Sequence, residues 1–157
     1  MNSFKRVHDL CVKRQVSVAT AESCTSGFIS LNLSKNSGSS IFFKGGIIAY
    51  HNEIKIKVLG VDKLDINQFT EVSSEVAGQM AKGVRRFFSV DYAIATSGYA
   101  GPNGGSVNNP VGTVFIAISS VSGIFVNRFT FSGDRQEVIR QTSDKSASLL
   151  YNYIKKH

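Results

Sequence analysis

The chain has 157 residues, of which 42% are hydrophobic and 18% charged, and its formal net charge is +7. This length suits one domain (1–157), and so low a charged fraction argues against a disordered chain. There is no apolar stretch near the roughly 20 residues that span a bilayer and no signal-peptide pattern, and two cysteines are too few for a disulfide scaffold. We therefore expect a cytoplasmic protein with reduced thiols.

Hydrophobic periodicity predicts alternating helices and strands. In chain order we expect a helix (3–14), a strand (16–21), a helix (24–35), a strand (45–50), a short helix (52–58), a polar loop (62–72), a helix (73–88), a strand (91–97), a glycine-rich loop (98–110), two strands (111–120 and 123–131) and a last helix. The last helix is expected to run to about Lys155, with Asp134 and Glu137 forming a capping box. This order predicts an α/β fold.

The connections predict a mixed five-stranded sheet. Helices between the first three strands allow parallel pairing, whereas the links to the fourth and fifth strands contain no crossover helix and so predict antiparallel pairing. The fourth strand therefore runs opposite to the rest, and the carboxyl ends of the other four meet at one sheet edge. Ligands of open α/β sheets bind at such an edge. The segments that follow these four strands are 21–27, 50–55, 97–105 and 132–135.

Ser23, Cys24 and Thr25 lie where the first strand is expected to pass into a helix. Free backbone N–H groups at a helix start can stabilise an oxyanion, bind a phosphate or activate a nucleophile. The alternative is purely structural: Ser23 or Thr25 caps the helix and Cys24 is a small core residue.

A nucleophilic serine needs a base, and three candidates follow the second strand. A lysine that is shielded from water, such as Lys55, can lose its proton and serve as the base. His51 is the alternative base, and Tyr50 could relay a proton or hold the substrate. Lys55 could also belong to a solvated helix face, and Tyr50 could simply end a strand.

Two further features are compatible with a bound phosphate. The loop glycines Gly101, Gly104 and Gly105 could let backbone N–H groups approach a ligand, or could merely turn the chain; their spacing matches neither a P-loop nor G-x-G-x-x-G. Arg135 and Arg140 could pair with a phosphate, or be ordinary surface residues. No zinc or magnesium ligand pattern is present, so we expect no metal and no other cofactor.

Seven segments together resemble the CinA C-terminal domain family, that of the nicotinamide-nucleotide amidohydrolases. In order they are AESCTSG, GSSIFFKGGIIAYHNEIK, LGV, VSSEVAGQMAKG, ATSGYAGPNGG, NPVGTVFIAI and FSGDRQEVIR. The resemblance extends from about residue 5 to residue 153. It implies a three-layer α/β/α sandwich in the stand-alone form, without the molybdopterin-related domain of longer CinA proteins.

The resemblance also implies an activity, the deamidation of nicotinamide mononucleotide to nicotinate mononucleotide and ammonia in pyridine-nucleotide recycling. The family's nucleophile falls on Ser23, and its tyrosine and lysine fall on Tyr50 and Lys55. Its two arginines fall on Arg135 and Arg140. Two positions, Ser26 and Ser97, depart from the family pattern.

The expected partner is therefore a small-molecule nucleotide, not a nucleic acid or a membrane, and we expect a homo-oligomer. A non-catalytic nucleotide-binding module of the same fold is the alternative. Nucleic-acid binding, which the charge suggests, is disfavoured because basic residues never run longer than two and lack interleaved aromatics. The excess charge fits solubility and mild attraction of a phosphorylated substrate.

Overall fold

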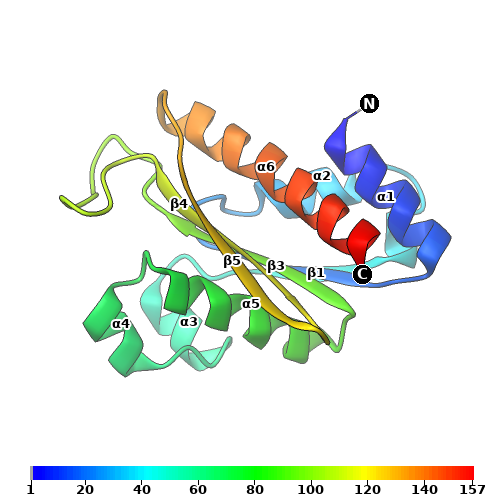
Figure 1. The fold of residues 1–157 in the computed structure, drawn as a ribbon, viewed down its shortest axis with the longest axis horizontal. Coiled ribbons are helices and arrows are strands. Elements are labelled where there is room, and N and C mark those ends of the chain that lie inside the picture. Colours follow the sequence, from blue (N-terminus) through cyan, green and yellow to red (C-terminus); the bar gives the residue numbers. More distant parts are fainter. Residues whose placement is uncertain (1) are drawn as a thin grey trace.

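A computed structural model describes residues 2–157, with a twisted sheet between two layers of helices (Figure 1). The elements are α1 (Ser3–Arg14), β1 (Val18–Glu22), α2 (Phe28–Ser34), the 3-10 helix η1 (Ser39–Ile41), β2 (Phe43–Ile48), α3 (Asn52–Lys57), α4 (Lys63–Phe69), α5 (Ser74–Phe88), β3 (Tyr92–Gly98), β4 (Thr113–Ser120), β5 (Gly123–Thr130) and α6 (Arg135–Lys156). Within the described chain, no helix is both long and apolar enough to cross a membrane.

The five strands form one sheet in the order β2-β1-β3-β4-β5. β1 pairs in parallel with β2 and β3, while β4 is antiparallel to both β3 and β5. The predicted mixed sheet, with its fourth strand opposed to the others, is confirmed. The carboxyl ends of β1, β2, β3 and β5 consequently share one edge, at the left of Figure 1, where α6 also begins.

Helices α1, α2 and α6 cover one face of the sheet, and α3, α4 and α5 cover the other (Figure 1). Alternate residues of each central strand enter two separate cores. Val18 and Ile94 pack under α1 and α6, whereas Ala19 and Ala93 pack against α5. Small alanines on the α5 side let that helix lie close to the sheet. With both faces covered, β1 and β4 are buried along their whole length, which makes the sheet a firm base for the loops at its edge.

The segment 62–72 corrects the sequence prediction, because it holds a helix instead of only a loop. Asp62 caps α4 by accepting from the Leu64 N–H at 2.8 Å. Gln79 of α5 accepts from the Asp62 N–H at 2.8 Å and donates to Asp65 at 2.5 Å. No side chain of α4 is buried, so it carries no strong apolar stripe. Its cap and this contact with α5 hold it in place.

The second helix also differs, since α2 begins at Phe28 rather than near residue 24. Ser26 and Gly27 have φ values of 47° and 92°, in the left-handed region that ends regular helix geometry. Ser23, Cys24 and Thr25 therefore form a turn between β1 and α2. Ser26, where the resembled family has glycine, is a non-glycine residue in a conformation that glycine adopts without strain.

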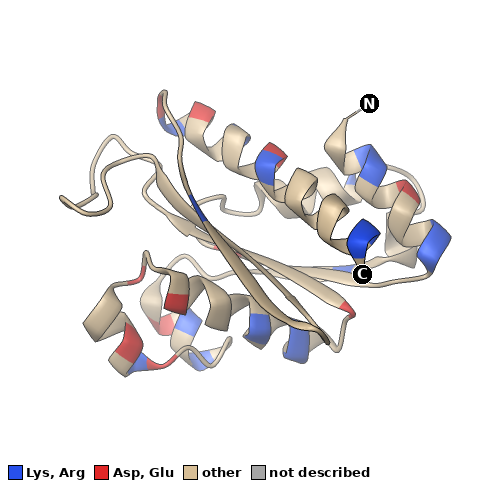
Figure 2. Ribbon diagram, viewed as in Figure 1, with Lys and Arg blue, Asp and Glu red and all other residues tan. Residues whose placement is uncertain are grey.

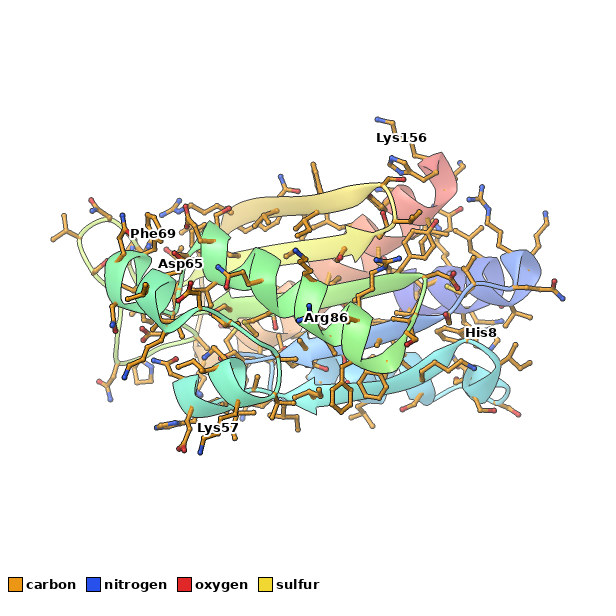
Figure 3. The ribbon with its side chains drawn as sticks, turned by 90° about the horizontal axis from the view of Figure 1, so that it is seen from below. His8, Lys57, Asp65, Phe69, Arg86 and Lys156 are labelled. Atoms are coloured by element: carbon orange, nitrogen blue, oxygen red, sulfur yellow. The ribbon has the colours of Figure 1, made fainter. Side chains whose placement is uncertain are left out.

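Lys and Arg residues occur on helices of both faces and at both ends of the molecule (Figure 2). In the view from below, Lys57 on α3 and Asp65 and Phe69 on α4 lie toward one end of the sheet, and His8 and Lys156 lie toward the other (Figure 3). The first of these ends is the one at which the strand carboxyl ends gather.

Candidate active site

A cleft of about 340 Å³ opens at the carboxyl edge of the sheet. All four segments predicted to meet there contribute to it, together with the link between α4 and α5. Its lining residues are Ser23, Cys24, Tyr50, His51, Asn52, Lys55, Glu71, Val72, Ser97, Gly98, Tyr99, Ala100, Asn103 and Arg135. The volume is at the small end of the range for small-molecule sites, about 300–1,000 Å³.

The turn that carries Ser23 is fixed from behind by Glu22, whose side chain is 1% exposed. One carboxylate oxygen accepts from the Thr25 hydroxyl at 2.6 Å and from the Gly27 and Ile29 N–H groups at 3.0 Å. The other accepts from the Ser30 N–H at 2.8 Å and the Ser30 hydroxyl at 2.7 Å. Five donors thus satisfy this buried charge, and they hold the turn rigidly against the start of α2.

This arrangement corrects the expectation that the start of the helix serves a ligand. The N–H groups at the beginning of α2 already bind Glu22, so the helix end offers them to the protein's own carboxylate. The backbone N–H groups of Cys24 and Thr25, in contrast, donate no hydrogen bond to another described residue. They are the free donors directly after Ser23, which is itself 8% exposed.

Lys55 lies in the wall of the same cleft, and its side chain is 1% exposed. Its Nζ donates to the Asn52 Oδ1 at 3.2 Å and to the Tyr50 carbonyl at 3.4 Å, both neutral acceptors. Within residues 2–157 no carboxylate forms an ion pair with it. Burial lowers the pKa of Lys55 from its ordinary value, and the nearby Glu71 charge opposes that change. Burial beside neutral acceptors therefore favours the neutral amine more than solvent would.

Tyr50 and Arg135 close one side of the cleft. Arg135 donates through Nη2 to the Tyr50 hydroxyl at 2.8 Å and through Nη1 to the Gly101 carbonyl at 2.7 Å. The guanidinium of this first residue of α6 is thereby bonded to the segment after β2 and to the glycine loop. Tyr50 only accepts in this contact, so its own O–H remains free to donate.

His51 also lines the cleft but has a structural task. It is the N-cap of α3, where its Nδ1 accepts from the Glu53 N–H at 3.3 Å. The side chain is exposed, and one ring nitrogen is occupied by this cap. Lys55 is therefore better placed than His51 to act as a base, because it is buried beside neutral acceptors.

Cys24 and Thr25, both predicted to bind substrate, lie differently from each other. Cys24 lines the cleft, but burial raises the pKa of its thiol to about 12, and a hydrogen bond with Thr96 only partly offsets this. The neutral thiol is a poor nucleophile. Thr25 faces inward, bonded to Glu22 and, at 2.8 Å, to Thr96, so it does not line this cleft.

The loop glycines turn the chain. Gly101, Gly104 and Gly105 all have φ between 83° and 92°. A Cβ on Gly105 would lie 2.8 Å from the Val111 nitrogen. None of the three is among the residues that line the cleft, although the Gly101 carbonyl binds Arg135. The interpretation of these glycines as turn residues is the one that the structure supports.

Arg140 lies apart from Arg135, in a neighbouring hollow of about 590 Å³. That hollow is formed between the starts of α2 and α6, and Thr25, Phe28 and Glu137 also line it. The structure therefore brings Ser23, Cys24, Tyr50, Lys55 and Arg135 together and leaves Arg140 outside the group.

Four cleft residues with polar side chains were not singled out from the sequence: Asn52, Glu71, Tyr99 and Asn103. Three of them belong to segments that were expected at this edge. Glu71 belongs to the segment predicted as a loop, and no periodicity or motif there distinguished it. Across residues 2–157 no group of three His, Cys, Asp or Glu side chains is arranged to hold a metal ion.

The family model for the CinA C-terminal domain matches residues 2–154. A CinA-like protein of Flavobacterium psychrophilum is 43% identical over 148 residues, which are 94% of this chain and 35% of that protein. A CinA-like protein of Fervidobacterium nodosum is 44% identical over 137 residues, 87% of this chain and 34% of that protein. The chain thus spans about a third of the length of these relatives.

Solved structures agree with the fold. A competence-damaged protein (CinA) superfamily protein from Klebsiella pneumoniae superposes with a TM-score of 0.95 at 30% identity and covers 100% of both chains. Another from Enterobacter cloacae gives a TM-score of 0.92 at 31% identity, covering 97% of this chain and 90% of that one. Their α/β architecture is the one described above.

Proposed function

The chain belongs to the CinA C-terminal domain family, and from this premise we propose that it hydrolyses the carboxamide of nicotinamide mononucleotide to nicotinate mononucleotide and ammonia. The observation that carries the proposal is the cleft that Ser23 shares with Lys55, a buried amine with no carboxylate ion-pair partner among the described residues. This pairing is the Ser–Lys form of an activated nucleophile.

In the proposed reaction the neutral Lys55 amine takes the proton of the Ser23 hydroxyl as Oγ attacks the carboxamide carbon. The carbonyl oxygen becomes an oxyanion, and the free N–H group of Cys24, which lines the cleft beside Ser23, is the donor we assign to it. This N–H group is held in place by the turn that Glu22 fixes.

Collapse of the tetrahedral intermediate releases ammonia and leaves an ester between Ser23 and the nicotinoyl group. The leaving nitrogen needs a proton, which the Lys55 ammonium supplies, with the Tyr50 hydroxyl as a relay. Water then attacks the ester with Lys55 again as base, and nicotinate mononucleotide and free Ser23 result. The steps need no metal and no redox partner.

Arg135 is the cation that we assign to the substrate phosphate. It lines the cleft and is already oriented by two hydrogen bonds. A guanidinium can bind phosphate oxygens through two parallel N–H groups. Arg140 is not given this role, because it lines the neighbouring hollow.

The test is ammonia release from nicotinamide mononucleotide by the purified protein and by its Ser23→Ala variant. Loss of the nucleophile should reduce kcat by about a thousandfold or more, as in other hydrolases with an activated serine. Ser122→Ala is the matched control, because Ser122 lies in the turn between β4 and β5, away from the cleft.

Two results would contradict the proposal. Full activity of Ser23→Ala would remove Ser23 as the nucleophile. Binding of the nucleotide to the wild-type protein with no ammonia release under varied conditions would favour a nucleotide-binding module instead.

A further inference from the structure

Glu71 is a carboxylate in the cleft that the proposed mechanism does not use. It lies in the link between α4 and α5, two residues before the Ser73 cap of α5. Its backbone is fixed, because the Ser97 hydroxyl donates to the Glu71 carbonyl at 2.5 Å. The next residue, Val72, is 2% exposed and accepts from the Asn109 side chain at 3.3 Å. The half-buried Glu71 side chain thus projects from an anchored segment.

The Glu71 carboxylate has no partner of its own. Within the described chain, no donor is hydrogen-bonded to its side chain and no cation lies within ion-pair distance of it. Lys55 is close enough to feel its charge but does not form an ion pair with it. Among the residues that line the cleft it is the only acidic one. A half-buried carboxylate without a partner can be stabilised by a cation that enters the cleft.

The Arg135 and Lys55 side chains of the cleft are basic. Arg135 suits a phosphate, and Lys55 is the proposed base. A substrate that carries only negative charge would gain nothing from Glu71 and would be repelled by it. The carboxylate becomes useful when the substrate has a positive charge at a second position.

The aromatic lining of the cleft is compatible with a flat cation. Tyr50 and Tyr99 both line it, and aromatic faces attract cations through the ring quadrupole. Carboxylate and aromatic side chains together are the groups that recognise quaternary nitrogen in other proteins. A pyridinium ring that carries a carboxamide has this chemistry, with its fixed positive charge on the ring nitrogen.

We infer that Glu71 is a specificity-determining residue that favours substrates in which the ring bearing the carboxamide is positively charged. The inference rests on the proposed function and deepens it, because it names the feature of the substrate that the cleft distinguishes. Neutral aromatic amides of the same shape should bind less well for lack of this interaction.

Two ligands isolate the ring charge. Nicotinamide mononucleotide has a cationic ring, and its reduced dihydro form has a neutral ring with the same carboxamide, ribose and phosphate. Both are titrated by calorimetry into the Ser23→Ala protein, which cannot turn them over by the proposed route. The same titrations are made with Glu71→Gln in that background, and with Glu75→Gln as a control that removes one exposed acid outside the cleft.

We expect Glu71→Gln to weaken binding of the oxidised nucleotide about tenfold, which is about 1.4 kcal/mol. Binding of the reduced nucleotide should change by no more than about twofold, the size of an ordinary surface substitution. Glu75→Gln should affect neither ligand by more than this. Equal weakening of both ligands, or no weakening of either, would overturn the inference.

Failure of the inference can be separated from failure of the proposed function. Suppose that the wild-type protein releases ammonia from nicotinamide mononucleotide, and that Glu71→Gln leaves the ratio of the oxidised and reduced nucleotides' affinities unchanged. In that case only the role of Glu71 is wrong. If the wild-type protein neither binds nor hydrolyses the nucleotide, the proposed function is wrong and the role of Glu71 falls with it.

Discussion

Glu22 and Glu71 are two carboxylates near the same serine, and they are treated in opposite ways. Glu22 is 1% exposed and accepts five hydrogen bonds from the turn and from the start of α2. Glu71 is half-buried, and no described donor bonds to its side chain. The first builds the wall of the cleft that carries Ser23, and the second faces into the cleft.

The difference shows that this fold contains two kinds of shielded polar group, those that support the structure and those that remain available to a ligand. A buried charge that is fully hydrogen-bonded is tied to the structure and contributes rigidity. A charge or amine that is shielded but has few partners keeps a strong field available to a ligand. Lys55, with two long hydrogen bonds to neutral acceptors, is like Glu71 a shielded group with few partners.

The strongest way to test this division is Lys55→Met, which keeps the length of the side chain but removes the amine. Under the proposed mechanism kcat should fall by about a thousandfold, within the range of about 10²–10⁴ that a general base contributes. Stability should not fall, because methionine suits a buried position that penalises charge. Ammonia release and urea unfolding measure the two effects.

His51→Ala is the control for this prediction, because His51 lines the same cleft and was the alternative base. Its loss removes the α3 cap, which costs stability of about 1 kcal/mol, with only a small change in kcat. A large loss of kcat in His51→Ala together with an active Lys55→Met would transfer the role of base to His51.

The next test acts on the satisfied carboxylate. Glu22→Gln places an amide NH₂ where an oxygen accepts from backbone or hydroxyl donors, so several donors lose their acceptor. We expect the free energy of unfolding to fall by about 3 kcal/mol, the scale for breaking buried hydrogen bonds to a charged group. Urea denaturation of Glu22→Gln measures it.

The matched substitution is Glu71→Gln, which should change the free energy of unfolding by less than about 0.5 kcal/mol because no hydrogen bond is lost. Similar destabilisation by both substitutions would mean that Glu71 is also part of the framework. The contrast between the two carboxylates would then disappear.

The architecture around these residues was accessible from sequence because it depends on connectivity. Crossover helices predict parallel strands and links without such a helix predict antiparallel ones, so the shared edge followed from element order. Ser23 follows β1, Tyr50 follows β2, Lys55 lies on α3, and Arg135 begins α6. All four line one cleft. Residue chemistry had suggested their roles with alternatives left open, and the family resemblance then singled out one role for each.

The features that the sequence did not predict have local physical causes. Arg140 follows Arg135 by five residues on α6, and about 100° per residue turns its side chain well away from that of Arg135. Ser26 and Gly27 adopt left-handed backbone that helical periodicity does not reveal, so α2 begins later than predicted. Glu71 lies in a polar segment whose path depends on contacts with Ser97 and Asn109, which are distant in sequence.

The smallest expected effect is a shift in pH dependence that links Lys55 to Glu71. Burial lowers the pKa of Lys55, and the negative charge of Glu71 acts to raise it. The proposed base is the neutral amine, so kcat should rise with pH as Lys55 loses its proton. Glu71→Gln removes a neighbouring negative charge, which lowers the pKa of Lys55 further. The acid limb of kcat should therefore move to lower pH.

Lys55 also makes the free energy of unfolding depend on pH. Between the lowered pKa of folded Lys55 and its unfolded value near 10.5, the unfolded chain binds a proton that the folded chain does not, so stability rises with pH there. Lys55→Met should abolish this rise, which urea unfolding at a series of pH values measures.

The pH profile of kcat is measured at saturating substrate, because Glu71→Gln also weakens binding. Glu75→Gln serves as the control. If Glu71→Gln moved the acid limb of the kcat profile to higher pH, Glu71 would not act on Lys55 through its charge. The same would follow if Glu75→Gln moved this limb by an equal amount.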